Sequence, residues 1–182
     1  MGEPLAGRLS PPDGVPFVGL ALGASEQSVV VASNAGYGFL ASLETLAVRN
    51  KAGKSLLNIP EGGCALPLVM LSDPTRDELA CVTNTGQLLV FPASELPTLA
   101  RGKGDRLINI PGSKARDGSE LLIAVVSLIP GASLKLVAGN RHLTLKPRDL
   151  DAYRGERARR GNKLPRGLQR VDEMVALEPG AA

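Results

Sequence analysis

The side chains best suited to chemistry in this sequence are basic residues that gather around glycines in three short stretches. Glycine lets a backbone approach a phosphate closely, and Lys or Arg neutralises the phosphate charge. Three such stretches predict a surface that binds a polyanion. The cations concerned are Arg49, Lys51 and Lys54; Arg101, Lys103 and Arg106; and Arg157, Arg159, Arg160 and Lys163, followed by Arg166.

Charge is distributed unevenly along the chain. Residues 1–100 carry 5 basic and 9 acidic side chains, whereas residues 101–182 carry 16 basic and 9 acidic ones. This asymmetry is typical of a protein that attracts a polyanion, although a solvated basic face without a ligand would look the same. Aromatic residues are scarce, with three Phe, two Tyr and no Trp. Single-stranded nucleic acid is bound by stacking bases on aromatic rings, so this composition argues against it as the main ligand.

The three basic stretches occupy the same place in a repeated sequence. Residues 31–60 and 81–111 share an Asn-Xaa-Gly turn and the ending Leu-Xaa-Asn-Ile-Pro, and residues 137–167 form a more diverged third copy. The offset between the first two copies is 50 residues before the basic stretch and 51 after it. Self-similarity at this period is typical of propeller-like proteins, whereas a β-sandwich of short strands would not require it.

Each copy predicts a hairpin, one helical turn, the basic loop and two further strands. Helical turns are expected near residues 43–47, 93–97 and 147–151. The expected strands of the first copy cover residues 28–33, 38–42, 55–59 and 66–71, and those of the second cover 78–83, 87–91, 106–110 and 121–128. About four strands in roughly 50 residues correspond to one blade.

We therefore expect an all-β protein with three blades. Their boundaries are predicted at residues 28–77, 78–132 and 133–175, with a tail over 176–182. Residues 1–27 look like the closing half of a blade whose opening half is absent. The chain is thus expected to begin in mid-repeat, as a piece of a longer protein, with an unpaired strand edge at residues 1–27.

Other motifs do not support a catalytic, cofactor or metal site. Residues 36–41 match a dinucleotide fingerprint, but the second copy lacks the second glycine and has strands on both sides. His142 is the only histidine, and Cys64 and Cys81 are the only cysteines, too few for a zinc site or a histidine-based triad. We predict no catalytic residue, no metal ligand and no cofactor in this chain.

A specific resemblance rests on three phrases: the basic boxes of Arg/Lys-Gly-Lys type, the pair GKSLLNIP and GDRLINIP, and the closing GERARRGNKLPRGLQRVDEM. They resemble the C-terminal domain of the A subunit of bacterial DNA topoisomerase IV (ParC), a relative of the gyrase A subunit. The resemblance covers residues 28–174 and, more loosely, 7–27. It implies a β-pinwheel of four-stranded blades and a non-catalytic role in binding, bending and gripping duplex DNA through the basic residues named above.

The resemblance also implies what the longer enzyme would do. It would pass one duplex through another with ATP and Mg, for decatenation and supercoil relaxation, with cleavage and ATP hydrolysis on other domains and on the B subunit. The cleaving tyrosine of the family follows an arginine in a winged-helix domain. Here Tyr153 precedes Arg154, so neither Tyr153 nor Tyr37 is expected to be a nucleophile.

Two departures from the family pattern limit this expectation. The gyrase string Gln-Arg-Arg-Gly-Gly-Lys-Gly is missing, which favours a weaker grip than the chiral wrapping of gyrase. The family's discs also have about five blades, against three and a remnant here, which leaves open whether this disc closes.

The partners implied are duplex DNA, a condensin-like chromosome organiser (MukB), and the B subunit, which the chain would reach through the rest of the A subunit. Docking of that organiser on the same cationic surface is the rival interpretation. The implied location is the cytoplasm, at the nucleoid or peripherally at the cytoplasmic face of the membrane, without insertion.

The third basic stretch is the densest and yields an expectation about stability. Exposed loop charges contribute little to folding. Replacing Arg157, Arg159 and Arg160 by alanine is therefore expected to weaken DNA binding and to leave the fold as stable as before.

Overall fold

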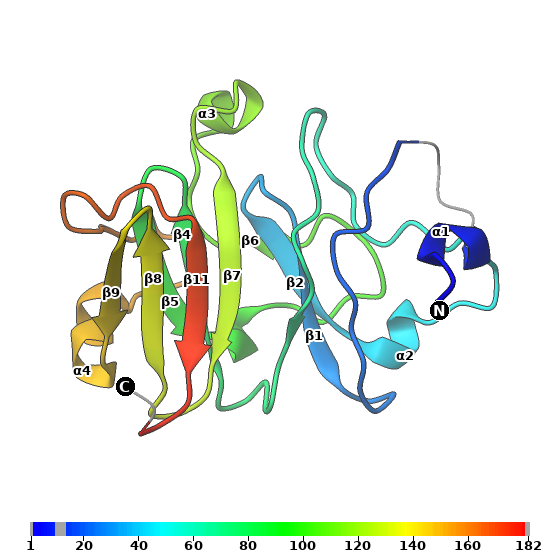
Figure 1. Ribbon diagram of the computed structural model, residues 1–182, viewed down its shortest axis with the longest axis horizontal. Coiled ribbons are helices and arrows are strands. Elements are labelled where there is room, and N and C mark those ends of the chain that lie inside the picture. The colour runs from blue at the N-terminus through cyan, green and yellow to red at the C-terminus, as the bar shows by residue number, and fades with distance from the viewer. Residues whose placement is uncertain (1, 10–13, 181–182) are drawn as a thin grey trace.

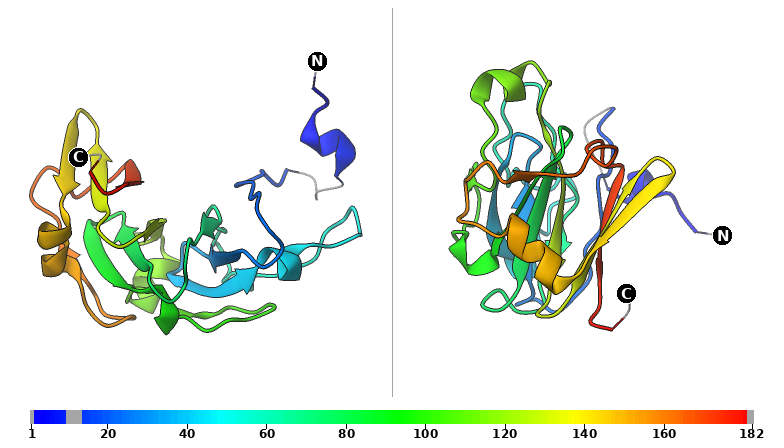
Figure 2. Two further views of the ribbon diagram at one scale, coloured as in Figure 1. Left: turned by 90° about the horizontal axis from the view of Figure 1, so that it is seen from below. Right: turned by 90° about the vertical axis from the view of Figure 1, so that its left-hand side faces the viewer.

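The computed structural model describes residues 2–9 and 14–180. Their strands form three antiparallel sheets that follow one another along an arc (Figure 1 and Figure 2). The strand orders are β3-β1-β2-β6, β10-β5-β4-β7 and β11-β8-β9. The expected all-β, pinwheel-type architecture is confirmed.

The strands are short, as the repeats predict. They are β1 Ser28–Ala32, β2 Tyr37–Ser42, β3 Val69–Met70, β4 Glu78–Thr83, β5 Gln87–Pro92, β6 Asp105–Arg106, β7 Leu122–Leu128, β8 Ser133–Ala138, β9 Arg141–Leu145, β10 Asn162–Lys163 and β11 Glu173–Leu177. The helices are α1 Leu5–Arg8, α2 Leu43–Leu46, α3 Gly112–Arg116 and α4 Pro147–Leu150, with 3-10 turns η1 Ala93–Glu95 and η2 Asp151–Tyr153. The expected helical turns are α2, η1 and α4, whereas α1 and α3 were not predicted.

The middle strands are apolar on both sides because the sheets pack face to face. Val30 and Leu40 of the first sheet share one cluster of buried side chains with Leu79 and Phe91 of the second. The opposite face of the second sheet packs against the third through Ala80, Val82, Leu88, Val90, Leu134 and Leu136. Burying each large side chain stabilises the fold by roughly 1.5–3 kcal/mol. We call these two packed boundaries the first interface and the second interface.

The repeated asparagine closes the hairpin end of the first two blades. Asn34 Oδ1 accepts the backbone N–H of Cys64 at 2.9 Å, and Asn84 Oδ1 accepts that of Leu121 at 3.0 Å. The backbone N–H groups of the two asparagines donate back to the carbonyl oxygens of Cys64 and Leu121, each at 3.0 Å. Because the contacts are the same, the residues just before Cys64 and Leu121 are structurally equivalent.

The fourth strand of each of the first two sheets comes from the next blade's basic stretch. β6 pairs with β2, which places Arg106 opposite Tyr37, and β10 pairs with β5, which places Lys163 opposite Gln87. A cut at the predicted boundaries, residues 78 and 133, would therefore remove one strand from each of the first two sheets. Without this exchange β2 and β5 would each expose an unpaired edge.

Three further expectations about strands are corrected. Residues 55–59 form no strand and make only an isolated bridge, between Leu57 and Gly102, because a loop lies beside them. Residues 106–110 leave the sheet after Arg106, because the backbone of Leu107 and Asn109 bonds instead to Gly36 in the hairpin turn and to the third basic stretch. β11 runs to Leu177 and pairs there with β8, so it extends into the segment predicted as a tail.

The closing strands expected in residues 1–27 do not form in the part of that segment that the structure describes. Residues 2–9 contain only α1, and residues 14–27 contain no strand. Residues 14–27 instead contact the first blade as an irregular segment: Gly19 lies beside Pro67, and the N–H groups of Leu43 and Glu44 donate to the carbonyl oxygens of Gln27 and Ser25. Leu20 and Leu22 are consequently about four-fifths exposed, at 78% and 81%.

The helices of this fold are all short. Within residues 2–9 and 14–180, none of them is long and apolar enough to cross a bilayer.

Candidate nucleic-acid interface

The three basic stretches form loops that lie in one row, which we call the basic row. Basic loop 1 is residues 49–54, basic loop 2 is residues 101–106 and basic loop 3 is residues 157–163. In the left panel of Figure 2 they follow the outer curve of the arc, coloured cyan, green and orange respectively.

Loops 1 and 2 are joined through the backbone. The N–H of Gly102 donates to the carbonyl oxygen of Leu56 at 2.8 Å, and the N–H of Asn58 donates to the carbonyl oxygen of Gly102 at 2.9 Å. Gly102 thus bonds to two residues, Leu56 and Asn58, of the segment that follows loop 1.

Loops 2 and 3 are joined in the same way one repeat later. The N–H of Ala158 donates to the oxygen of Leu107 at 3.1 Å, and the N–H of Asn109 donates to that of Arg159 at 2.9 Å. Leu107 and Asn109 are the repeat equivalents of Leu56 and Asn58. A similar two-bond contact, made by Gly102 in the first case and by the neighbours Ala158 and Arg159 in the second, sets the three loops in a continuous row.

Loops 2 and 3 are each fixed against the preceding sheet by a glycine. A Cβ on Gly104 would lie 2.2 Å from the Gly38 oxygen, and one on Gly161 would lie 2.5 Å from the Leu88 oxygen. Both glycines have positive φ, +75° and +73°. Gly53, with φ +72°, holds the matching place in loop 1, but a Cβ there would have nothing within 4 Å. Gly53 is therefore not packed against a strand, unlike its two equivalents.

Tyr37 anchors the cations of loop 2. The Lys103 ammonium lies 3.9 Å from the centre of the Tyr37 ring, and Arg106 donates to the Tyr37 hydroxyl at 3.0 Å. The hydrogen bond from Arg106 holds the pKa of Tyr37 below its ordinary value, despite partial burial that acts the other way. Both cations nevertheless remain exposed, so this anchoring orders the loop without hiding its charge.

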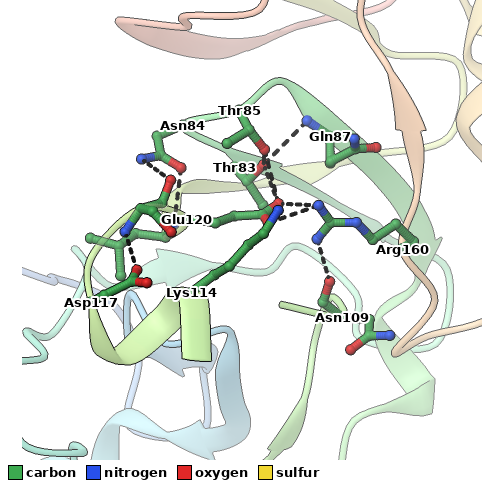
Figure 3. Close-up of polar contacts among 11 residues, drawn as sticks. Thr83, Asn84, Thr85, Gln87, Asn109, Lys114, Asp117, Glu120 and Arg160 are labelled. Atoms are coloured by element: carbon green, nitrogen blue, oxygen red, sulfur yellow. Dashed lines mark hydrogen bonds and ion pairs between the residues drawn. The ribbon is translucent and has the colours of Figure 1, made fainter. Parts of the chain in front are cut away.

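Two arginines of loop 3 have structural partners (Figure 3 shows one of them). Arg157 donates to the backbone oxygen of Arg106 at 2.8 Å and lies 3.3 Å from the Asp105 carboxylate. Arg160 donates to the Glu120 carboxylate at 2.7 Å. These two guanidinium groups bind loop 3 to the second blade, which corrects the expectation that all three arginines replaced above are simply exposed loop charges.

Glu120 is the centre of a polar cluster in the second interface (Figure 3). Its side chain is fully buried, accepts from Thr85 Oγ1 at 2.9 Å and lies 3.7 Å from the Lys114 ammonium. Burial raises its pKa, but the hydrogen bonds from Arg160 and Thr85 and the nearby positive charges outweigh this and hold the pKa below its ordinary value. The carboxylate is therefore charged. No sequence motif marked it, because a single Glu before an apolar strand is unremarkable.

The remaining predicted residues present their charge to solvent. Lys54 donates to the backbone oxygen of Thr45, and Arg159 pairs at 2.7 Å with Glu156, both side chains of that pair staying more than two-thirds exposed. Five others are exposed and form no ion pair with the residues that the structure describes. These free cations are Arg49, Lys51, Arg101, Lys163 and Arg166.

Residues considered for other chemistry lie apart. His142 is exposed on β9, Cys64 is exposed, and Cys81 is buried, which raises its thiol pKa. Tyr153 packs against the second interface. Across the described ranges, no group of three or more His, Cys, Asp or Glu is placed to hold a metal ion.

Comparison with known proteins agrees with this architecture. Residues 27–63 and 77–128 match the family model described as the DNA gyrase C-terminal domain, a β-propeller. The solved structure of the E. coli ParC C-terminal domain superposes with a TM-score of 0.89 at 40% identity, over 98% of this chain and 71% of that one. The gyrase A C-terminal domain shares only the fold, at TM-score 0.67 and 13% identity over 85% of this chain and 50% of that one.

The fold and the family model thus define a C-terminal domain of the gyrase type. Full-length relatives narrow the assignment: the A subunit of DNA topoisomerase 4 is 48% identical in Pseudomonas aeruginosa and 42% identical in Haemophilus influenzae, each over 98% of this chain. The chain belongs to the family of C-terminal domains of the DNA topoisomerase IV A subunit. It spans about a quarter, 24%, of each of these two relatives.

Proposed function

We propose that this chain binds duplex DNA along the basic row and curves it around the outer side of the arc. The observation that carries the proposal is the repeated backbone contact, from Gly102 and from Ala158 to the residues that follow the preceding loop, which brings the three cationic loops side by side. Lys and Arg on such a surface neutralise phosphates and release counterions. Contacts of this kind go to the backbone and carry little sequence information.

In the longer protein, this grip would select and hold a duplex segment for ATP-dependent strand passage in decatenation and supercoil relaxation. Cleavage would lie in the rest of the A subunit, whereas ATP with its Mg would bind on the B subunit. The support for this wider role is the similarity to the A subunits of DNA topoisomerase 4. This chain matches about a quarter of each of these relatives.

The test is a titration of labelled duplex by fluorescence anisotropy at several salt concentrations. Replacing the free cations Arg49 and Arg101 together should reduce the magnitude of the log–log salt slope by up to about 1.8, at about 0.9 per lost phosphate contact. All duplex sequences should weaken alike. The matched control is Arg8→Ala with Arg76→Ala, two exposed cations outside the basic row, which should leave the slope unchanged.

The second candidate is docking of a chromosome-organising partner of the MukB kind on the same surface. It is favoured by the same observation, since exposed cations without acidic neighbours also suit an acidic protein surface. If the Arg49→Ala, Arg101→Ala protein binds duplex as tightly as the parent at low salt, the basic row does not bind DNA and docking takes its place.

A further inference from the structure

The first and second interfaces use equivalent positions differently. At the second interface, the Glu120 carboxylate fills the space between Thr85 in the hairpin turn and Arg160 in the basic loop. At the first interface, the equivalents of these three residues are Gly63, Ala35 and Lys103. Gly63 is fixed as the equivalent of Glu120 because Cys64 and Leu121, the next residues, make identical contacts with the repeated asparagines.

The basic-loop equivalence is equally well defined. Lys103 precedes Gly104 and Arg160 precedes Gly161, the two glycines that lie against the preceding sheet. Three residues after these glycines, Leu107 and Leu164 donate to the carbonyl oxygens of the hairpin-turn glycines, each at 2.8 Å. The first interface therefore keeps a cation, Lys103, in the place of Arg160 but has Gly63, which lacks a side chain, in the place of Glu120.

A cavity of about 450 Å³ lies at this place. Lys103 and Arg116 line it, against one acidic side chain, Glu61. Its remaining wall includes Ala35 and Pro60 of the first blade and Ile110 and Ala115 of the second. The cavity thus combines an excess of positive charge with an apolar wall.

Asn34 supplies a hydrogen-bond donor at the wall of this cavity. The residue is only 7% exposed and borders the cavity. Its Oδ1 is used by the Cys64 N–H, whereas its Nδ2 has no hydrogen-bond partner among the described residues. The amide nitrogen is not one of the buried polar atoms that lack a partner, so it is open to solvent and free to donate to an acceptor that enters the cavity.

We propose that this cavity binds the carboxylate of an acidic side chain from a partner protein, in the place that the Glu120 carboxylate occupies one interface later. The partner segment would carry an apolar residue beside the acid, for the wall formed by Ala35 and Ile110. This site goes beyond the DNA binding proposed above. A duplex phosphate is the poorer fit, because the cavity is recessed and partly apolar whereas duplex phosphates lie on a convex surface.

The experiment is an NMR titration of the chain with N-acetyl-Glu-Leu-amide, followed through backbone amides. Saturable shifts are expected at residues 34–37 and 62–63. The matched N-acetyl-Gln-Leu-amide should bind at least about tenfold more weakly, because it lacks the charge that strengthens hydrogen bonds from Lys and Arg. Absence of saturable shifts with the acidic peptide would overturn the proposal.

Variants separate this site from the basic row. Arg116→Ala should weaken peptide binding about tenfold or more and leave duplex affinity unchanged, whereas Arg76→Ala should change neither. If inorganic phosphate or a short duplex shifts the same amides at lower concentration than the peptide, the cavity is a phosphate site and the proposal is wrong.

A gain-of-site variant completes the test. Glu120→Ala should open the second interface to the same peptide, with new shifts at residues 84–87 and a rise in Tm on adding the peptide. If the variant folds and shows no new shifts, the equivalence of the two sites is refuted. If it does not fold, the titration of the parent chain decides alone.

Discussion

Arg160 reaches from basic loop 3 across the second interface and donates to Glu120 at 2.7 Å, although the glutamate side chain is fully buried. A second hydrogen bond of Arg160, to the backbone oxygen of Asn109 at 2.9 Å, ties the same guanidinium to the chain that leaves loop 2. The densest part of the basic row thus also stabilises the fold. Some of its arginines hold loop 3 against the second blade, and others present their charge to solvent.

The first prediction separates those roles by stability. Arg160→Ala should lower the free energy of unfolding by about 2–3 kcal/mol, because it leaves the buried Glu120 carboxylate with Lys114 as its main compensating charge. Arg159→Ala, which removes only an exposed pair with Glu156, should cost at most about 0.5 kcal/mol. Urea unfolding measures both. Equal values for the two variants would contradict the structural role of Arg160.

The second prediction concerns acid. The pKa of Glu120 is lower in the folded chain than its ordinary value, so the unfolded chain binds this proton more readily. The stabilisation is complete above the unfolded pKa, roughly 4.3, and is lost as pH falls through the lower folded value. Glu120→Gln should be less stable than the parent at neutral pH, and the difference should shrink below about pH 4.3.

Unfolding curves at a series of acidic pH values check this. Asp73 and Asp117 also have lowered pKa values, each set first by the hydrogen bond of a nearby hydroxyl residue. Both carboxylates are present in parent and variant alike, so the difference between the two profiles isolates Glu120. A difference that stays constant with pH would show that the Glu120 carboxylate adds nothing through its charge.

How far the sequence could predict this structure depends on the kind of contact involved. Asn34 and Asn84 mark hairpin turns by local chemistry, so the repeats located β1, β2, β4 and β5 to within one residue or so. The pairing of Tyr37 with Arg106 joins residues of different copies. A period in sequence does not say which copy completes which sheet, so the exchange of β6 and β10 could not be read from it.

The basic row was predicted because charge and glycine recur at one phase of the repeat. Positions at which one copy differs from the others cannot be predicted in this way. Glu120 stands where the first copy has Gly63. The second copy has an insertion that contains α3 just before this position, so the two residues do not align at the period of the repeat. The pairing of Arg160 with Glu120 could therefore not be predicted from the repeat. The cavity beside Lys103 has the same origin, because Gly63 has no side chain to fill the place of Glu120.

The third prediction uses the two tyrosines as reporters of the two interfaces. The hydrogen bond from Arg106 lowers the pKa of Tyr37, whereas burial and then the charge of Asp149 raise that of Tyr153. Ultraviolet difference spectra should show two separate tyrosinate transitions, Tyr37 first. Arg106→Ala should move the first transition to higher pH and leave the second in place. A single merged transition in the parent would argue against the loop 2 anchor.

The last prediction compares three equivalent glycines. Gly104→Ala and Gly161→Ala should each cost about 3 kcal/mol or more, or prevent folding, because a Cβ would lie 2.2 Å and 2.5 Å from backbone oxygens of the preceding sheet. Gly53→Ala meets nothing within 4 Å and should cost only the strain of a positive φ, about 1 kcal/mol. Thermal unfolding ranks the three. The comparison is controlled internally, since φ is nearly the same at all three positions and only the neighbouring strand differs. If Gly53→Ala is as damaging as Gly104→Ala, then loop 1 is also packed against a strand, and the asymmetry along the basic row does not exist.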